Sequence, residues 1–222
     1  MNEFGLNDYK KMYNKYGLKL VLLYFIENHL FDIINRTDTH KRLLIKDFPQ
    51  DIKNLSDGIM YMASFKSVVN ETLSLVKEVE KNFQSFNLVD IGSGKGKVLI
   101  LWKKYLSKFK FNNKVYGFEY NTTLCNIAKN NLYKTGIGDV EIFNVEVSST
   151  NELFNERNIY YLFNPFGKRT LIKFIELQSC PNYIIYNNPV HLEVLINLKY
   201  KIISQKSGFH PNLNWAVLYR DN

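Results

Sequence analysis

Three glycines at alternate positions, Gly92, Gly94 and Gly96, directly follow a short apolar segment at residues 88–91. Glycine adopts backbone angles that other residues avoid, and a ligand can approach its main chain without meeting a Cβ. Apolar residues then recur at helical spacing: Val98, Leu101, Trp102 and Tyr105. The pattern predicts a buried strand, a sharp turn and a helix, with space for a nucleotide-like ligand at the turn.

Strand and helix patterns alternate through the rest of the chain. Further strands are expected at residues 114–120, 140–145, 159–164, 183–186, 200–205 and 215–220. Helices are expected at residues 66–83, 122–133, 168–178 and 191–198. This alternation predicts an α/β fold: a doubly wound, mostly parallel seven-stranded sheet with helices on both faces and a C-terminal antiparallel hairpin. Ligands of such sheets bind beyond the carboxyl ends of the strands.

The first 58 residues lack strand patterns, and they end in a turn signal, Ser56-Asp57-Gly58. We expect residues 1–58 to form an N-terminal helical extension packed on a core domain of residues 59–222. Residues 18–34 are predicted to form an amphipathic helix whose apolar stripe packs on that domain. The stripe consists of Leu22, Leu23, Ile26, Leu30 and Ile33. Polar residues within the segment disfavour a membrane-spanning helix, and docking on a membrane surface stays open as an alternative.

The formal net charge of +8 permits an anionic partner such as RNA. The lysines are spread along the chain, however, and their densest group is expected to be the solvated end of a helix: Lys103, Lys104, Lys108 and Lys110. Cys125 and Cys180 lack metal-ligand spacing, so both are expected to be buried thiols and no metal site is predicted. The N-terminal residues show no secretory signal pattern, and a cytoplasmic location is expected.

Acidic residues lie where a nucleotide-like cofactor would need them. Asp90 stands at the end of the first strand, where it would repel a phosphate but favour a cationic ligand. Glu119 ends the next strand and could accept both hydroxyls of a ribose, with Tyr120 beside it. Glu146 follows the third strand and could accept from an adenine amino group. A dinucleotide site would need glycine where Lys97 stands, and the spacing of a P-loop is also missing.

Residues 88–99, Leu-Val-Asp-Ile-Gly-Ser-Gly-Lys-Gly-Lys-Val-Leu, and residues 115–119, Val-Tyr-Gly-Phe-Glu, resemble the first two motifs of class I S-adenosylmethionine-dependent methyltransferases. Residues 160–166 and 186–189 are similar to the fourth- and fifth-strand motifs of a poorly characterised bacterial branch of that superfamily. Three further features are similar to that branch: Phe31-Asp32, Thr37-Asp38-Thr39 and Tyr61. Thr37 stands where the branch has glycine.

The resemblance covers about residue 31 to the C-terminus, and it implies S-adenosylmethionine as the cofactor. The candidate cofactor-binding residues are Tyr61, Asp90, Gly92, Ser93, Gly94, Gly96, Glu119, Tyr120, Glu146 and Asn164. Tyr61 would close the cofactor pocket, unless it is simply a core aromatic.

Asn164, Pro165 and Phe166 end the fourth strand and are the candidates for catalysis. Methyl transfer mainly requires alignment of the nucleophile, and the Asn164 amide oxygen could accept hydrogens from an amine. The segment partly resembles the Asn-Pro-Pro-Phe/Tyr motif of amino-group methyltransferases, with Phe166 in place of the second proline. Alternatively, Asn-Pro only ends the strand and Phe166 caps the core. An oxygen acceptor would need a base, for which His191 and His210 are candidates.

These predictions leave several functions open. The first is methyl transfer to a nitrogen or oxygen of an unidentified acceptor, either a small molecule or a protein side chain. An RNA or protein-lysine methyltransferase would use the same cofactor site, with the positive charge near its opening. A noncatalytic S-adenosylmethionine-binding module is the alternative of a different class. A dehydrogenase is a further alternative.

Overall fold

The computed structural model describes residues 6–41, 61–150 and 155–221. Its sheet has seven strands in the order β3-β2-β1-β4-β5-β7-β6. Their bounds are β1 (Asn87–Ile91), β2 (Val115–Phe118), β3 (Val140–Phe143), β4 (Asn158–Phe163), β5 (Asn182–Asn187), β6 (Lys201–Lys206) and β7 (Trp215–Arg220). Strands β1 to β5 pair in parallel, and β7 runs antiparallel to both β5 and β6. The predicted mostly parallel sheet with a C-terminal hairpin is therefore confirmed.

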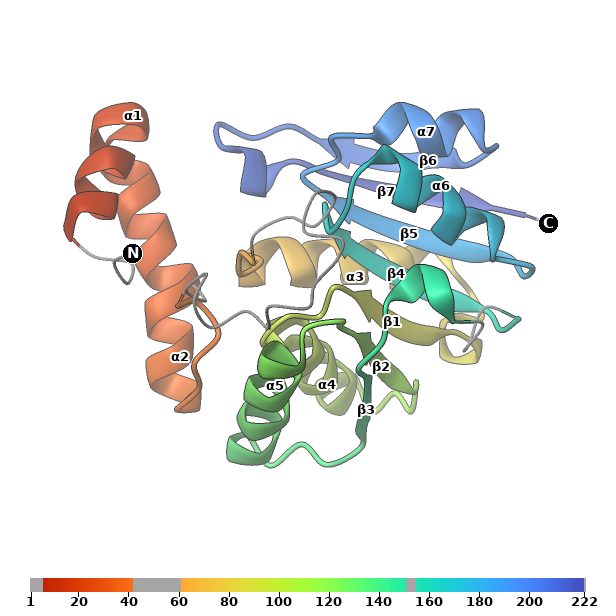
Figure 1. The fold of residues 1–222 in the computed structure, drawn as a ribbon, viewed down its shortest axis with the longest axis horizontal. Coiled ribbons are helices and arrows are strands. Elements are labelled where there is room, and N and C mark those ends of the chain that lie inside the picture. The colour runs from red at the N-terminus through yellow and green to blue at the C-terminus, as the bar shows by residue number, and fades with distance from the viewer. Residues whose placement is uncertain (1–5, 42–60, 151–154, 222) are drawn as a thin grey trace.

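Helices cover both faces of this sheet (Figure 1). The helices are α3 (Lys66–Val79), α4 (Lys97–Phe109), α5 (Thr122–Lys134), α6 (Lys168–Glu176) and α7 (Leu192–Asn197). One apolar cluster joins the sheet to α3, α4 and α5, and a second joins it to α6 and α7. Alternate residues of β4 enter opposite clusters, because neighbouring side chains of a strand point to opposite faces. Burial on both faces explains why β4 is a continuous apolar run.

The helix predicted at residues 66–83 ends earlier than expected, at Val79. The chain becomes extended at Glu80 and then forms a short 3-10 turn, Phe83–Ser85, before it enters β1. Phe83 is buried as the helical pattern implied, but it reaches the core from this separate turn. The Asn113 side-chain amide donates to the carbonyls of Phe83 and Phe86, which holds the turn in place.

The N-terminal segment consists of α1 (Leu6–Tyr24), a π-helical turn η1 (Phe25–His29) and α2 (Leu30–Asn35). It forms a long helical segment at one edge of the molecule (Figure 1). Gly17 interrupts α1 with φ 73° and ψ −176°. Leu20 and Phe31 are buried in the core cluster that includes α3 and α4. The domain boundary predicted at residue 58 lies outside the described residues.

The predicted packing face of this segment is largely wrong. Of the five residues in the predicted stripe, Leu23 packs against the core. The others are exposed to solvent: Leu22, Ile26, Leu30 and Ile33. Both sides of the helix are apolar, so helical spacing alone could not decide which side faces inward. The inward side also carries Glu27, Asn28 and Asp32, whose burial depends on hydrogen-bond partners in distant segments and in the residues after α2.

Two smaller predictions concern cysteines and charge. Cys125 is buried as expected, whereas Cys180 is only half-buried, next to the Asn155 carbonyl that its thiol contacts. Lys104, Lys108 and Lys110 are exposed, as expected of a solvated helix end, whereas Lys103 is only 17% exposed and forms an ion pair with Asp139. Among the described helices, none combines the length and apolar character that crossing a membrane requires.

Candidate functional site

The glycine-rich turn runs from the end of β1 into α4 and is held against β2. Gly92, Gly94 and Gly96 all have positive φ, at 74°, 53° and 80°. The backbone N–H groups of Gly92 and Ser93 both donate to the Phe118 carbonyl, at 2.8 and 2.9 Å. These bonds fix the turn at the carboxyl ends of two neighbouring parallel strands, which is where α/β sheets bind ligands.

Each glycine leaves space for a different neighbouring residue. A Cβ at Gly92 would lie 2.9 Å from Pro165 Cβ, and one at Gly94 would lie 2.1 Å from the Tyr61 ring. At Gly96 it would lie 3.2 Å from Ala128 Cβ in α5. The first two glycines therefore let other candidate site residues reach the turn, whereas the third allows helix packing.

Two buried carboxylates stand beside this turn. Asp90 and Glu119 are only 3% and 4% exposed. Glu119 Oε2 accepts from the Gly94 N–H at 2.9 Å, and its Oε1 accepts from the Asn121 N–H at 2.9 Å. Burial raises the pKa of Glu119 to about 7, and burial together with the nearby Glu119 raises the pKa of Asp90 well above its usual range. No lysine, arginine or histidine among the described residues forms an ion pair with either acid.

This donor set fits the groups of S-adenosylmethionine. Its ammonium and sulfonium charges would offset two buried carboxylates that have no cationic partner in the described chain. Its ribose hydroxyls could donate to the remaining lone pairs of Glu119, since each carboxylate oxygen has room for a second hydrogen bond. A phosphate would instead meet two acids.

Tyr61 lies directly on the turn and is not part of a helix, because α3 begins only at Lys66. Its hydroxyl donates to the Thr39 carbonyl at 2.5 Å, and Lys95 Nζ lies 5.9 Å from the centre of its ring. Burial, followed by the charges of Asp32, Asp90 and Asp38, raises its pKa well above the usual value. Tyr61 therefore connects the glycine turn with the N-terminal segment.

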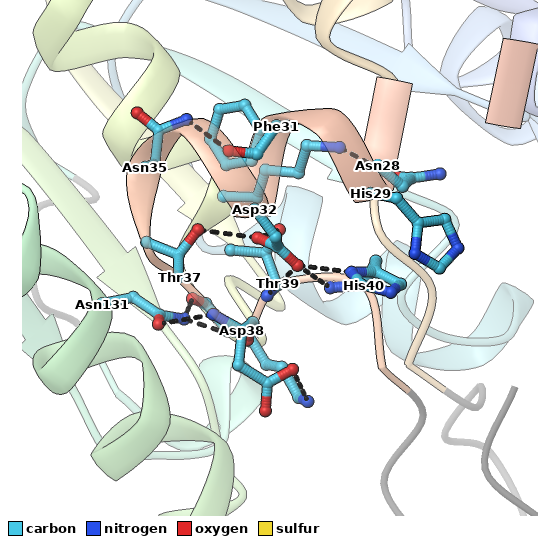
Figure 2. Close-up of polar contacts among 12 residues, drawn as sticks. Asn28, His29, Phe31, Asp32, Asn35, Thr37, Asp38, Thr39, His40 and Asn131 are labelled. Atoms are coloured by element: carbon cyan, nitrogen blue, oxygen red, sulfur yellow. Dashed lines mark hydrogen bonds and ion pairs between the residues drawn. The ribbon is translucent and has the colours of Figure 1, made fainter. Parts of the chain in front are cut away.

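Asp32 organises that N-terminal segment (Figure 2). Its carboxylate accepts from the side chains of Thr37 and Thr39 and from the backbone N–H groups of Thr39 and His40. It also contacts His40 Nδ1 at 2.5 Å. Burial alone would raise the pKa of Asp32, but the hydrogen bonds from His40, Thr37 and Thr39 outweigh it and lower the pKa to about 2.

The segment around Asp32 also contacts the glycine turn directly. Lys95 Nζ lies 3.2 Å from Asp38 Oδ1. The Asn131 side chain, from α5, accepts from the Asp38 N–H and donates to the carbonyls of Asp38 and Lys95, as Figure 2 shows for Asp38. The Asp32 network and the glycine turn are thus parts of one hydrogen-bonded unit.

Lys97 makes a second connection between the N-terminal segment and the start of α4. Its ammonium donates to the Glu27 carbonyl and to Asn28 Oδ1, both at 2.7 Å. Burial lowers the pKa of Lys97 to about 7, against the opposing effect of Glu27. Lys97, which stands where a dinucleotide site would need glycine, therefore links the N-terminal segment to α4.

Sequence reasoning missed the roles of Lys95, Lys97, Asn131 and His40. Of these, Lys95 and Lys97 are each 2% exposed, which is rare for lysine. The family resemblance at Asp32 and at residues 37–39 pointed to this region, but it did not indicate what those residues contact. Asn131 lies 93 residues from its partner Asp38, so no local pattern could reveal it.

Asn164 and Pro165 lie next to the glycine turn, through the contact of Pro165 with Gly92. Asn164 has φ 43°, is 9% exposed, and accepts from the Tyr186 hydroxyl through Oδ1 at 3.1 Å. A left-handed conformation before proline is uncommon, because proline also restricts the preceding residue. Phe166 packs against Phe174 of α6, within the second apolar cluster.

The remaining candidates are more scattered. Tyr120 is 40% exposed beside Glu119, and Glu146 is exposed, three residues beyond the end of β3. The Ser93 hydroxyl is buried without a hydrogen-bond partner in the described chain and lies against Gly117 of β2.

The two histidines proposed as bases lie in different surroundings. His191 precedes α7, where its backbone N–H donates to the Tyr186 hydroxyl at 3.4 Å. His210 packs against Tyr16 and Phe65, and burial lowers its pKa. Its neighbours are thus the N-terminal helix and the residue before α3.

No family model and no curated protein matches this sequence. Among solved structures, the chain is similar to one described as a class I S-adenosylmethionine-dependent methyltransferase from Listeria monocytogenes, with TM-score 0.55 and 12% identity. That match covers 76% of this chain and 64% of the other. A second is MtNAS in complex with MTA and tNA, with TM-score 0.53, 12% identity, and coverage of 70% and 61%.

A third is TrmN from Thermus thermophilus, with TM-score 0.50 and 12% identity, covering 70% of this chain and 48% of the other. Identities this low establish a shared fold only. The strand order, the C-terminal hairpin and these likenesses agree, and the chain has the Rossmann-like fold of class I S-adenosylmethionine-dependent methyltransferases.

Proposed function

We propose that the protein is an S-adenosylmethionine-dependent methyltransferase that acts on a nitrogen or oxygen of its acceptor. The observation that carries the proposal is the pair of buried carboxylates, Asp90 and Glu119, beside a glycine turn in this fold. Two buried acids without a cationic partner in the described chain are costly unless a ligand compensates them. A cationic nucleoside such as S-adenosylmethionine would supply both the charge and the hydroxyl donors.

Different candidate residues would bind different parts of S-adenosylmethionine. Glu119 would hold the ribose, with Tyr120 and Glu146 toward the adenine. Asp90 would favour the charged methionyl part, and Gly92 and Gly94 would let Pro165 and Tyr61 lie close to the turn around the ligand. Tyr61 would close the site over Gly94, and this position supports a role in the pocket in place of a core aromatic.

Asn164 and Pro165 would position the acceptor. Bound S-adenosylmethionine supplies a methyl carbon that is already activated by the sulfonium charge. The chain then has to align a nucleophile and accept its hydrogen bonds. The Asn164 amide oxygen and the nearby backbone carbonyls could accept hydrogen bonds from an amine. The placement of Asn164 next to the glycine turn supports this role.

Ligand-induced thermal stabilisation tests the cofactor. S-adenosylhomocysteine at about 100 times its Kd is expected to stabilise the protein by about 2.7 kcal/mol. For a chain of this length that corresponds to a rise in Tm of roughly 5–10 °C. NAD is expected to cause no rise. A rise with NAD and none with S-adenosylhomocysteine would indicate a dehydrogenase instead.

Asn164→Ala tests catalysis separately from binding. With cell extract as the source of acceptors and a labelled methyl group on S-adenosylmethionine, we expect at least tenfold less incorporation than with the wild type, and S-adenosylhomocysteine binding within threefold. Asn188→Ala is the matched control, because Asn188 also precedes a proline and has φ 49° at the end of the neighbouring strand β5. Binding without any incorporation by the wild type would indicate a noncatalytic module.

A further inference from the structure

The N-terminal helical segment carries an exposed apolar face. Five aliphatic residues at a constant spacing of four form what we name the outer stripe: Leu18, Leu22, Ile26, Leu30 and Ile34. All five are exposed, from 38% at Leu30 to 69% at Ile34. Phe25 and Ile33 beside them are 47% and 66% exposed. Contiguous exposed apolar surface of this kind marks an interaction site.

The outer stripe cannot turn toward the core, because the opposite side of the same helix is already anchored. Leu20 and Phe31 are buried in the core. The Glu27 carboxylate accepts from the Ser67 N–H at 3.1 Å, and Lys97 holds the Glu27 carbonyl and the Asn28 side chain. The segment is therefore fixed with its second apolar face outward.

The π-helical turn helps to keep the outer stripe on one side. In a regular α-helix, residues four apart advance by about 40° per step, so five of them would spiral through about 160°. The wider turn at Phe25–His29 lies in the middle of the stripe and reduces this drift. It also frees backbone carbonyls from the regular bonding pattern, and Lys97 binds one of them, the carbonyl of Glu27.

The exposed charges on this segment are all positive. Between residues 7 and 36 the exposed charged side chains are Lys10, Lys11, Lys15, Lys19 and Arg36. Asp8 is half-buried, and the other acids, Glu27 and Asp32, are buried. An exposed apolar face with lysines and no exposed acid is the pattern of helices that lie in the interface of a membrane.

We propose that the outer stripe docks on the surface of an anionic phospholipid bilayer, with the helix parallel to the membrane. The aliphatic side chains would enter the boundary between headgroups and acyl chains, and the lysines would bind lipid phosphates. A second copy of the chain, packed on the same face, would offer these lysines no exposed acid of the described helical segment. RNA binding would leave these seven apolar side chains exposed, because its affinity comes mainly from contacts with phosphates.

Vesicle co-sedimentation tests the proposal with the full chain. We expect binding to vesicles of phosphatidylglycerol and phosphatidylcholine at least tenfold tighter than to phosphatidylcholine alone. Binding should be weaker in 1 M salt, which screens the lysines with a screening length of ~3 Å. The double variant Leu22→Ser, Ile26→Ser should lose at least tenfold in affinity. Lys15→Glu, Lys19→Glu should lose the preference for anionic vesicles.

The matched control is Ile202→Ser, Ile203→Ser, which removes two isoleucines of β6 that are 40% and 41% exposed. It should bind vesicles as the wild type does. Melting temperatures verify that each variant is folded. The proposal is overturned if the wild type binds neither vesicle, or if Leu22→Ser, Ile26→Ser binds normally. A wild-type dimer that this double variant converts to a monomer, without vesicle binding, would assign the stripe to a second copy.

Discussion

Gly94→Val is expected to abolish S-adenosylhomocysteine binding, so that the ligand no longer raises Tm. A side chain at this position would stand 2.1 Å from the Tyr61 ring, far closer than two carbons can approach. It would therefore force the Tyr61 ring off the turn, where that ring closes the proposed pocket. We expect affinity to fall by at least about 1000-fold, which corresponds to about 4 kcal/mol.

Gly136→Val is the matched control for this variant. Gly136 has φ 70°, close to the left-handed conformation of Gly94, but a Cβ there would meet no atom within 4 Å. Both variants therefore share the backbone strain of a side chain at positive φ, about 1–2 kcal/mol, and differ only in the space they fill. Equal binding losses in the two variants, or normal binding by Gly94→Val, would place the cofactor elsewhere.

Glu119→Gln is expected to weaken S-adenosylhomocysteine binding by about 100-fold. A hydrogen bond to a charged group contributes about 1.5–3 kcal/mol, and the substitution removes the charge that both ribose hydroxyls would use. The amide nitrogen of glutamine would also face a backbone N–H, of either Gly94 or Asn121. Isothermal titration gives the affinity, and Glu141→Gln on β3 controls for the loss of a carboxylate outside the site.

The same carboxylate makes binding depend on pH. Because burial raises the pKa of Glu119 to about 7, part of the free protein has a protonated Glu119 at neutral pH. The ribose hydroxyls donate to the ionised form, so binding should be strongest above pH 7 and should weaken as pH falls through that value. Well below the pKa the loss approaches about tenfold per pH unit. The slope should be smaller in Glu119→Gln, and an unchanged slope there would exclude Glu119 as its origin.

Local patterns were sufficient for the sheet and for the position of two acids of the candidate site. The helix predicted at 122–133 is observed as Thr122–Lys134, and the final strand was predicted with its observed bounds, Trp215–Arg220. Asp90 and Glu119 could be placed beside the glycine turn because parallel strands bring their carboxyl ends to one edge of the sheet. Glu146 was harder to place, because it lies three residues beyond β3, where the strand no longer controls its direction.

The amino-acid sequence by itself therefore determined the alternation of strands and helices, the glycine turn and the acids at the ends of two of the strands. These features depend on periodicity and on backbone angles, which act over a few residues. Only the tertiary structure decided which face of the N-terminal helix packs inward and how Tyr61, Lys95 and Asp38 meet at the turn. Those outcomes depend on hydrogen bonds and ion pairs between residues tens of positions apart, such as Lys97 with Asn28 and Asn131 with Asp38. Their energies arise only once the whole fold brings the partners together.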